Sequence, residues 1–217
     1  MLTDLGIQLS DAGRPEEALP AEREAVAIRR ELAGADPDQY FPDRALSLNN
    51  LAIWLGELGR PRDAFSAADE AVAIRRELAP ASPDRYRPDL ATSLNNFGVR
   101  LAELGCTEDA LPVSQEAVAL YRDLARADPD RHRPSLASSL GSLASRLAAL
   151  DRWADAVPVT EEAVAIRREL ATANPDRYRP ALAASMDRLS EILSTLGRQT
   201  DAEAVRHEVA GFRALAD

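Results

Sequence analysis

Two pairs of adjacent asparagines are the residues in this sequence best suited to bind another molecule. Asn49 with Asn50 forms the first pair, and Asn95 with Asn96 forms the second, 46 positions further along the chain. An asparagine side chain both donates and accepts hydrogen bonds, so it can pair with the backbone amide of a peptide of any sequence. If the two pairs lie side by side, they form a short ladder of amide groups suited to reversible binding.

The composition argues against most kinds of catalytic site. None of the 26 basic residues is a lysine, which excludes a phosphate-loop lysine, a Schiff base and a lysine general base. One cysteine, Cys106, and two histidines, His132 and His207, are too few for an internal disulfide or a cysteine-rich zinc site. Carboxylates are abundant, but no pair stands out as an acid–base site. We therefore expect no enzyme activity, no cofactor and no metal.

The charge balance and the lack of long apolar runs restrict the partners and the location of the protein. Acidic residues outnumber basic ones by 36 to 26, which gives a formal net charge of −10, and no basic run occurs. A nucleic-acid partner is not expected, because such binders carry a basic patch. The start of the chain lacks the basic and apolar segments of a signal peptide, and no run reaches the roughly 18 apolar residues of a membrane helix. The sequence thus predicts a cytoplasmic protein with no membrane partner.

An internal repeat with a period of 46 residues dominates the sequence. The segment Glu-Ala-Val-Ala-Ile-Arg-Arg-Glu-Leu begins at Glu24, Glu70 and Glu162, with a close relative at Glu116 and a degenerate copy at Glu208. Several proline and glycine positions keep the same period, without insertion or deletion. Self-similarity at a fixed period of this size is the signature of a repeat architecture.

Each repeat unit is predicted to contain two helices. In the second copy, apolar residues recur at three- and four-residue steps from Leu48 onward, which is typical of one helix face. Gly59 is suited to a left-handed cap at the end of this helix. Pro42 and Pro61 fit the first positions of the two helices, where a missing N–H costs nothing. The segment 83–88, Pro-Asp-Arg-Tyr-Arg-Pro, is expected to end the second helix and to form a loop.

Three prolines leave the start of the second helix open. Pro20, Pro112 and Pro158 lie several residues inside it, where proline removes a backbone hydrogen bond. Either these helices begin late or they bend at the proline. No window shows the two-residue alternation of a strand, so the chain is predicted to be all-α.

One pair of helices cannot bury its apolar faces alone, so neighbouring pairs are expected to stack. The predicted fold is an all-α, right-handed α-solenoid of about five antiparallel helix pairs, forming one domain over residues 1–217. Its inner surface is expected to come mainly from the first helices. The repeat units are predicted at approximately 1–41, 42–87, 88–133, 134–179 and 180–217.

The sequence resembles the tetratricopeptide repeat (TPR) family. The resemblance is carried by apolar positions at helical spacing around a central glycine, namely Leu48, Leu51, Ala52, Leu55, Gly59, Ala64, Ala68 and Ala71. The usual repeat of about 34 residues is shorter and richer in aromatic residues. The stretch Leu-Asn-Asn-Leu-Ala followed by Glu-Ala-Val-Ala-Ile-Arg-Arg is most similar to the longer repeats of the kinesin-light-chain subclass.

The resemblance implies a non-catalytic scaffold that binds an extended peptide or partner protein in a concave groove. In the family, an asparagine at the place of Asn50 and Asn96 clamps a peptide backbone. The acidic side chains of Glu57 and Glu103 favour a neutral or basic partner segment. In the other interpretation, the asparagines satisfy helix ends or neighbouring loops. The groove residues expected to turn away from the packing face are Asn49, Asn50, Ile53, Glu57, Asn95, Asn96, Val99, Glu103 and Ser142.

A series of arginines in the proline-flanked segments forms a predicted stripe along one edge. It could dock an anion or an acidic protein, but pairing with acidic residues of neighbouring repeats, such as the series of Glu77, is the commoner outcome. The arginines are Arg85, Arg87, Arg131, Arg133, Arg177 and Arg179.

The two ends of the array differ. In the last copy Glu203, Arg206 and Ala210 replace apolar or small residues, which gives the polar outer face of a terminal repeat. The N-terminal end has no such cap. Either upstream sequence is missing, or this end pairs with a second copy in a homo-oligomer. The alternative functions are therefore a self-assembling structural repeat protein, or the sensing or scaffolding array of a larger signalling ATPase or protease.

Overall fold

The computed structural model describes residues 15–214, and these residues form helices joined by short connections. The prediction of an all-α fold is confirmed. The expected first helix of the first copy, and with it the N-terminal end of the array, lies outside the described residues. The helices are α2 (Pro15–Ala35), α3 (Pro37–Glu57), α4 (Pro61–Ala81), α5 (Pro83–Glu103), α6 (Thr107–Ala127), α7 (Pro129–Ala149), α8 (Trp153–Ala173), α9 (Pro175–Thr195) and α10 (Gln199–Ala214).

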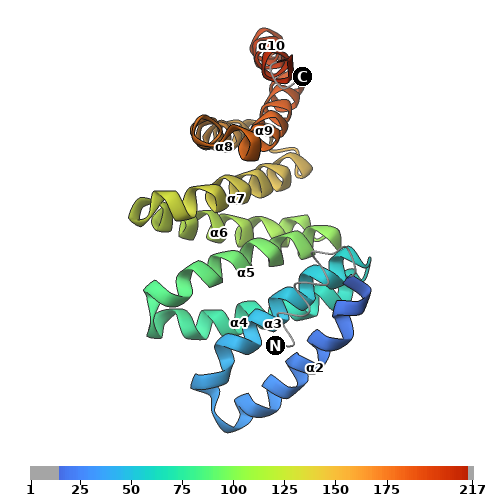
Figure 1. Cartoon of the computed structure of the whole chain (residues 1–217). Coiled ribbons are helices and arrows are strands. Elements are labelled where there is room, and N and C mark those ends of the chain that lie inside the picture. Colours follow the sequence, from blue (N-terminus) through green and yellow to red (C-terminus); the bar gives the residue numbers. More distant parts are fainter. Residues whose placement is uncertain (1–14, 215–217) are drawn as a thin grey trace. The chain divides into compact units, whose positions relative to one another are not determined.

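The period of 46 residues follows from the helix lengths. The helices from α2 to α9 have 21 residues each. They are separated alternately by one residue and by three, so two helices with their two connections make one repeat. Helices with such short connections must be antiparallel neighbours, and Figure 1 shows successive helices running in opposite directions.

The chain divides into two compact units, residues 1–113 and residues 114–217, with the boundary inside α6. In the first unit α2 packs on α3, α3 on α4 and α4 on α5, while α3 also touches α5. In the second unit α7 packs on α8, α8 on α9 and α9 on α10. Contacts between successive helices are typical of a TPR-like solenoid. The prediction that residues 1–217 form a single domain stays a prediction.

The proline-flanked segments are helical, so the predicted loop at residues 83–88 is wrong. Only Ser82 separates α4 from α5, and Pro83 occupies the first position of α5. The corresponding cap residues of α3, α7 and α9 are Asp36, Asp128 and Asn174, and each side-chain oxygen accepts a hydrogen bond 3.2 Å long from the backbone N–H three residues later. A capping side chain followed by proline is typical of a helix start. The N–H groups of the first turn have no acceptor within the helix, so the missing N–H of proline costs no hydrogen bond there.

The helices therefore begin five residues earlier than predicted, and Pro42 lies inside α3 rather than at its start. Pro20, Pro112 and Pro158 likewise lie within the continuous helices α2, α6 and α8. This excludes the alternative that these second helices begin late.

A residue in the left-handed conformation follows the first helix of each described pair, as predicted for Gly59. Its φ is 66°, and the N–H of Arg60 donates to the carbonyl of Leu55 at 2.8 Å. Gly105 and Gly197 have φ values of 78° and 76° at the equivalent places. Asp151 replaces the glycine in the third described pair and still adopts a φ of 56°. The hydrogen bonds of this cap are kept, because Arg152 N–H donates to the Leu147 carbonyl at 2.9 Å.

Replacing Asp151 with glycine should raise the free energy of unfolding by about 1 kcal/mol, since a left-handed residue with a Cβ carries roughly that penalty. The lost hydrogen bond from Trp153 Nε1 to Asp151 Oδ1, 3.2 Å long and exposed, is worth less. Urea denaturation followed by circular dichroism measures the change. Gly105→Ala is the matched control and should lower stability by a similar amount. A less stable Asp151→Gly protein would show that the aspartate favours this cap.

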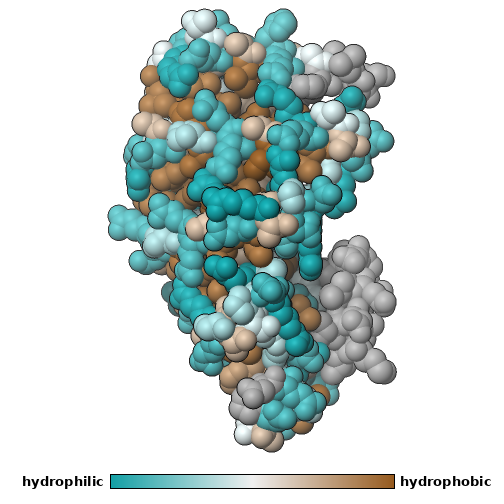
Figure 2. All heavy atoms as spheres, turned by 90° about the vertical axis from the view of Figure 1, so that its left-hand side faces the viewer, coloured by the Kyte–Doolittle hydropathy of each residue, from teal (hydrophilic) through white to brown (hydrophobic). Residues whose placement is uncertain are grey.

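Small aliphatic side chains make the core. In the first unit Leu48, Leu51, Ala52 and Leu55 of α3 pack against Ala64, Ala68 and Ala71 of α4, the face predicted from their spacing. Trp54 is also buried and belongs to the core. In the last helix Glu203, Arg206 and Ala210 are exposed, which confirms the polar face predicted for the final copy. On the side of the molecule drawn in Figure 2, hydrophobic side chains show between polar ones at the height of α8 to α10.

Candidate functional site

The predicted groove residues come from the first helices of three successive repeats. α3 supplies four of them and α5 another four, and these two helices touch within the first unit. Ser142 belongs to α7 in the second unit and is partly buried. On α3 and α5, Glu57 and Glu103 are exposed, Asn49 is buried, and the partly buried residues are Asn50, Ile53, Asn95, Asn96 and Val99.

Asn49 does not turn away from the packing face, and this part of the prediction is wrong. Its side chain is only 7% exposed. Its Oδ1 accepts hydrogen bonds from Asn96 Nδ2 at 3.0 Å and from Ser93 Oγ at 3.3 Å. Because a buried amide must find partners inside the protein, Asn49 links α3 to α5 instead of offering its oxygen to a ligand. The two asparagine pairs do meet, but through this contact between helices.

Asn50 and Asn95 each have one side-chain atom without a hydrogen-bond partner in the part of the chain that the structure describes. Nδ2 of Asn50 and Oδ1 of Asn95 are shielded from water and have no partner there. Both side chains are partly exposed, and the last torsion of an asparagine is broad, so a small rotation can present either amide group at the surface. One unpaired donor and one unpaired acceptor thus lie on two helices that contact each other.

A buried arginine beneath these asparagines was not found from the sequence. Arg75 of α4 is only 4% exposed, and its Nη1 donates to Ser93 Oγ at 2.5 Å and to the Asp89 carbonyl at 2.7 Å. Arg29 and Arg167 make the same contact to Ser47 and Ser185. The sequence does contain a pattern that indicates this contact. Serines recur at the repeat period, and each lies 18 residues after the first arginine of the repeated segment wherever that arginine is present.

The second arginine of the repeated segment pairs with the glutamate that opens the next copy. Arg30 binds Glu70 with a shortest N–O distance of 2.8 Å, and Arg168 binds Glu208 at 2.8 Å. Arg122 holds Glu162 with two hydrogen bonds of 3.1 and 2.5 Å, and this contact raises the pKa of its guanidinium. Each pair joins the second helices of successive repeats. The two arginines of the segment therefore make different contacts between repeats. The first donates to a serine of the next first helix, and the second forms an ion pair with the next second helix.

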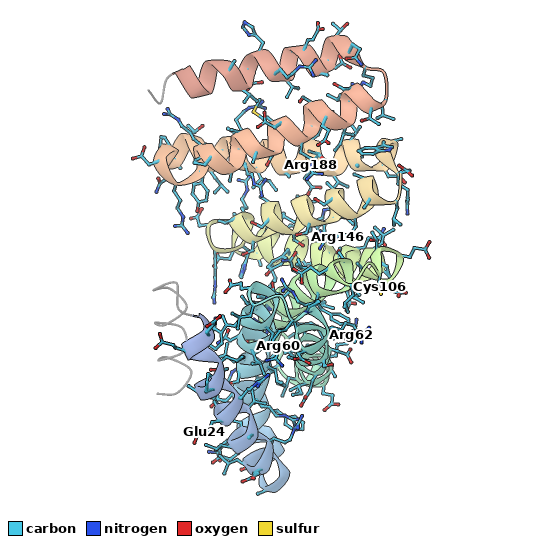
Figure 3. All side chains as sticks on the ribbon, turned by 90° about the vertical axis from the view of Figure 1, so that its right-hand side faces the viewer. Glu24, Arg60, Arg62, Cys106, Arg146 and Arg188 are labelled. Atoms are coloured by element: carbon cyan, nitrogen blue, oxygen red, sulfur yellow. The ribbon has the colours of Figure 1, made fainter. Side chains whose placement is uncertain are left out.

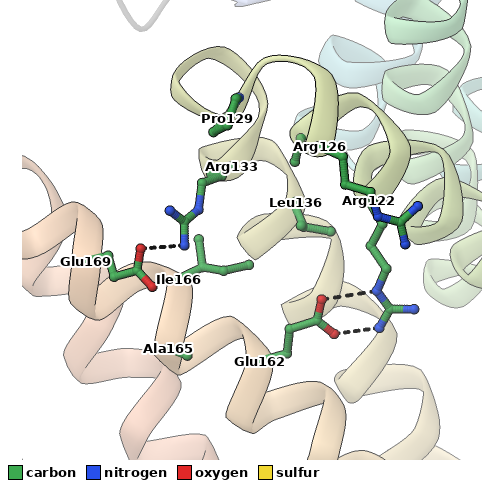
Figure 4. A pocket seen from close by; sticks show the side chains of 10 residues that line it. Arg122, Arg126, Pro129, Arg133, Leu136, Glu162, Ala165, Ile166 and Glu169 are labelled. Carbon is green, nitrogen blue, oxygen red and sulfur yellow. Dashed lines mark hydrogen bonds and ion pairs between the residues drawn. The ribbon is translucent and has the colours of Figure 1, made fainter.

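An open pocket of about 360 Å³ lies between α6, α7 and α8 in the second unit. Figure 4 shows that its charged walls pair with each other, Arg122 with Glu162 and Arg133 with Glu169. The ion pair between Arg133 and Glu169 is 2.5 Å long and confirms the pairing expected for this arginine of the edge stripe. Since these charges already have partners, this pocket is a weak candidate for binding an anion.

Neither the cysteine nor the acidic residues of the described part form a reactive or metal-binding cluster. Cys106 is exposed in the turn before α6, and Figure 3 shows it at the edge of the molecule. Within residues 15–214, no three His, Cys, Asp or Glu side chains lie close enough together to hold a metal ion. Among the helices described, none is long and apolar enough to cross a membrane.

Comparison with known proteins agrees with the fold and the repeat. The sequence matches the tetratricopeptide repeat family over residues 1–39, 44–84, 90–129 and 136–174. The chain therefore belongs to the tetratricopeptide repeat family, whose members generally act as scaffolds for protein interactions and are typically non-catalytic. No curated protein matches the chain in sequence.

Solved structures with a similar fold include kinesin-light-chain-like repeat proteins, as the resemblance in sequence predicted. A Podospora anserina kinesin light chain with nearly identical TPR-like repeats is 22% identical, with a TM-score of 0.76 over 99% of this chain and 94% of that chain. BtubC (BKLC) from P. vanneervenii is 21% identical, with a TM-score of 0.78 over 99% of this chain and 79% of that chain. MamA from Desulfovibrio magneticus RS-1 is 17% identical, with a TM-score of 0.66 over 100% of this chain and 95% of that chain.

Proposed function

We propose that this protein is a non-catalytic scaffold that binds an extended peptide segment of a partner protein along α3 and α5. The observation that carries the proposal is the unsatisfied hydrogen-bonding capacity of Asn50 and Asn95. A buried donor or acceptor without a partner is unfavourable in the free protein, so a peptide backbone that supplies the missing bonds gains affinity from them.

The neighbouring side chains set the character of the partner segment. Ile53 and Val99 are partly exposed apolar residues one helical turn beyond the asparagines, and they offer contact area to small apolar side chains. Glu57 is exposed and carries a negative charge, whereas Glu103 forms an ion pair with Arg100 at 3.0 Å. A neutral or basic segment therefore fits this surface better than an acidic one. Asn49 and the Asn96 amide nitrogen keep the two helices in register and contribute indirectly.

The test is selection of binding peptides from a random library displayed on phage. The intact protein should enrich neutral or basic peptides, and the Asn50→Ala/Asn95→Ala protein should bind the selected peptides at least about tenfold more weakly, the effect of one to two hydrogen bonds. The control is Gln39→Ala/Gln115→Ala, which removes two exposed amides elsewhere and should bind normally.

The choice of Asn95 rather than Asn96 keeps the test clear, because Asn96→Ala also breaks the hydrogen bond to Asn49. Equal peptide affinities of the intact protein and the Asn50→Ala/Asn95→Ala protein would refute the assignment to this surface. A loss of affinity in both double variants would refute it as well.

A further inference from the structure

A small pocket in the second unit lies between α7, α8 and α9, away from the asparagines of α3 and α5. Its volume is about 150 Å³. Small residues make most of its wall, and two arginines supply its charge. The lining residues include Gly141, Ser145, Thr160, Arg167, Ser185 and Arg188.

Two residues that line this pocket are smaller than their counterparts in the first unit. Two repeat periods earlier, Asn49 and Ile53 occupy the positions of Gly141 and Ser145. There the Asn49 amide accepts a hydrogen bond from Ser93 Oγ, the counterpart of Ser185. At Gly141 a Cβ atom would lie 3.6 Å from Nη2 of Arg167, so a side chain longer than that of alanine at residue 141 would extend into the space beside this guanidinium.

Arg167 is half-buried in this pocket without a negative partner. Its Nη1 donates to Ser185 Oγ and, at 3.4 Å, to the Ala181 carbonyl, and no carboxylate of the described residues pairs with it. Burial lowers the pKa of its guanidinium, and no acidic neighbour opposes this change. Arg122 is different, because Glu162 raises its pKa. The charge on Arg167 is thus partly desolvated and uncompensated, which is unfavourable in the empty pocket.

Arg188 adds a second positive charge to the same pocket. It occupies the position of Asn96 in the first unit, and Figure 3 shows it on α9. Its side chain is 44% exposed, and its contact with Glu191 is loose, with 3.9 Å from Nε to Oε2. The guanidinium is therefore free to reorient toward a ligand. Two guanidinium groups beside one small cavity repel each other until an anion enters.

We propose that this pocket binds a compact oxyanion, either a carboxylate or a phosphate group, between Arg167 and Arg188. The planar donor fork of arginine matches the two oxygens of such groups and gives strong, charge-assisted hydrogen bonds. Small side chains around Gly141 give the oxygens room to approach. The pocket involves no residue of α3 or α5, so the inference is independent of the proposed peptide surface.

The experiment uses the full chain and follows the arginine side-chain Nε–Hε signals by NMR. Sodium phosphate or sodium acetate is added at constant ionic strength, and sodium chloride is added to a separate sample as the control. Phosphate or acetate should shift the signals of Arg167 and Arg188 saturably, and chloride should not. Saturation by phosphate alone identifies a phosphate site, and saturation by acetate identifies a carboxylate site. Equal shifts with all three salts, or none, would overturn the proposal.

Two variants test the pocket itself. Gly141→Asn/Ser145→Ile restores the residues of the first unit, and Arg188→Asn restores the residue at the place of Asn96. Each should weaken binding of the effective anion at least about tenfold, because the first variant occupies the space for the anion and the second removes a charged hydrogen-bond donor. Arg168→Gln, next to Arg167 but outside the pocket, should bind normally. If the Gly141→Asn/Ser145→Ile protein does not fold, the exposed Arg188→Asn variant still tests the proposal. Unchanged anion binding by the Arg188→Asn protein would overturn it.

Discussion

Replacing Arg75 with methionine is expected to lower the free energy of unfolding by about 3 kcal/mol. The guanidinium of Arg75 is buried and donates to Ser93 Oγ and to the Asp89 carbonyl. Hydrogen bonds from a charged donor contribute roughly 1.5–3 kcal/mol each, and their loss leaves buried acceptors unsatisfied. Methionine keeps the apolar stem, so the change isolates the polar head from simple loss of volume. Urea denaturation followed by circular dichroism measures the loss.

The control for Arg75→Met is Arg62→Met, on the same helix α4 but exposed. A surface arginine contributes little, so Arg62→Met should change the free energy of unfolding by less than about 0.5 kcal/mol. If Arg75→Met were as stable as Arg62→Met, the buried guanidinium would contribute nothing net to the joint between α4 and α5.

Two serines at the same position of the repeat should respond to alanine with opposite signs. Ser93 is 1% exposed, accepts from Arg75 and donates to Asn49. Ser139 is 0% exposed, but its Oγ has no hydrogen-bond partner among the described residues, and Tyr121 stands where the other copies have the arginine. Ser93→Ala should therefore lower the free energy of unfolding by about 2 kcal/mol, while Ser139→Ala should raise it by about 1 kcal/mol.

The pair of serine variants forms its own control, because the change of side chain, the burial and the place in the repeat are the same. Parallel urea titrations of Ser93→Ala and Ser139→Ala give both values. Equal destabilisation in the two proteins would mean that the loss comes from packing alone and that the arginine contact is energetically neutral.

The period and the apolar spacing were enough to predict the fold. The positions of Leu48 and Ala64 are apolar in every copy, and a fixed period without gaps leaves few alternatives to stacked helix pairs. The predicted starts of the first helices are wrong because a proline such as Pro83 is compatible with the end of one helix and with the start of the next. At the equivalent Pro37, the capping side chain of Asp36 marks the start of the helix.

The site was predictable only in part, because the face of a helix that becomes an inner surface depends on the next repeat. Asn49 and Asn50 are adjacent and chemically identical, yet only Asn49 meets Ser93 and Asn96. Arg75 was missed for a similar reason. Charged side chains are usually exposed, and only the placement of Ser93 and Asp89 on the following helix reveals that this one is not.

The pairing of Glu70, Glu162 and Glu208 with an arginine 40 residues earlier has a consequence for how such a chain can change in length. Because the pair Arg30 with Glu70 and the pair Arg122 with Glu162 are equivalent, a duplication or deletion of 46 residues recreates the same polar joint at the new boundary. Copies could thus be gained or lost during evolution by recombination within the repeated segment, without any compensating substitution in this set of ion pairs.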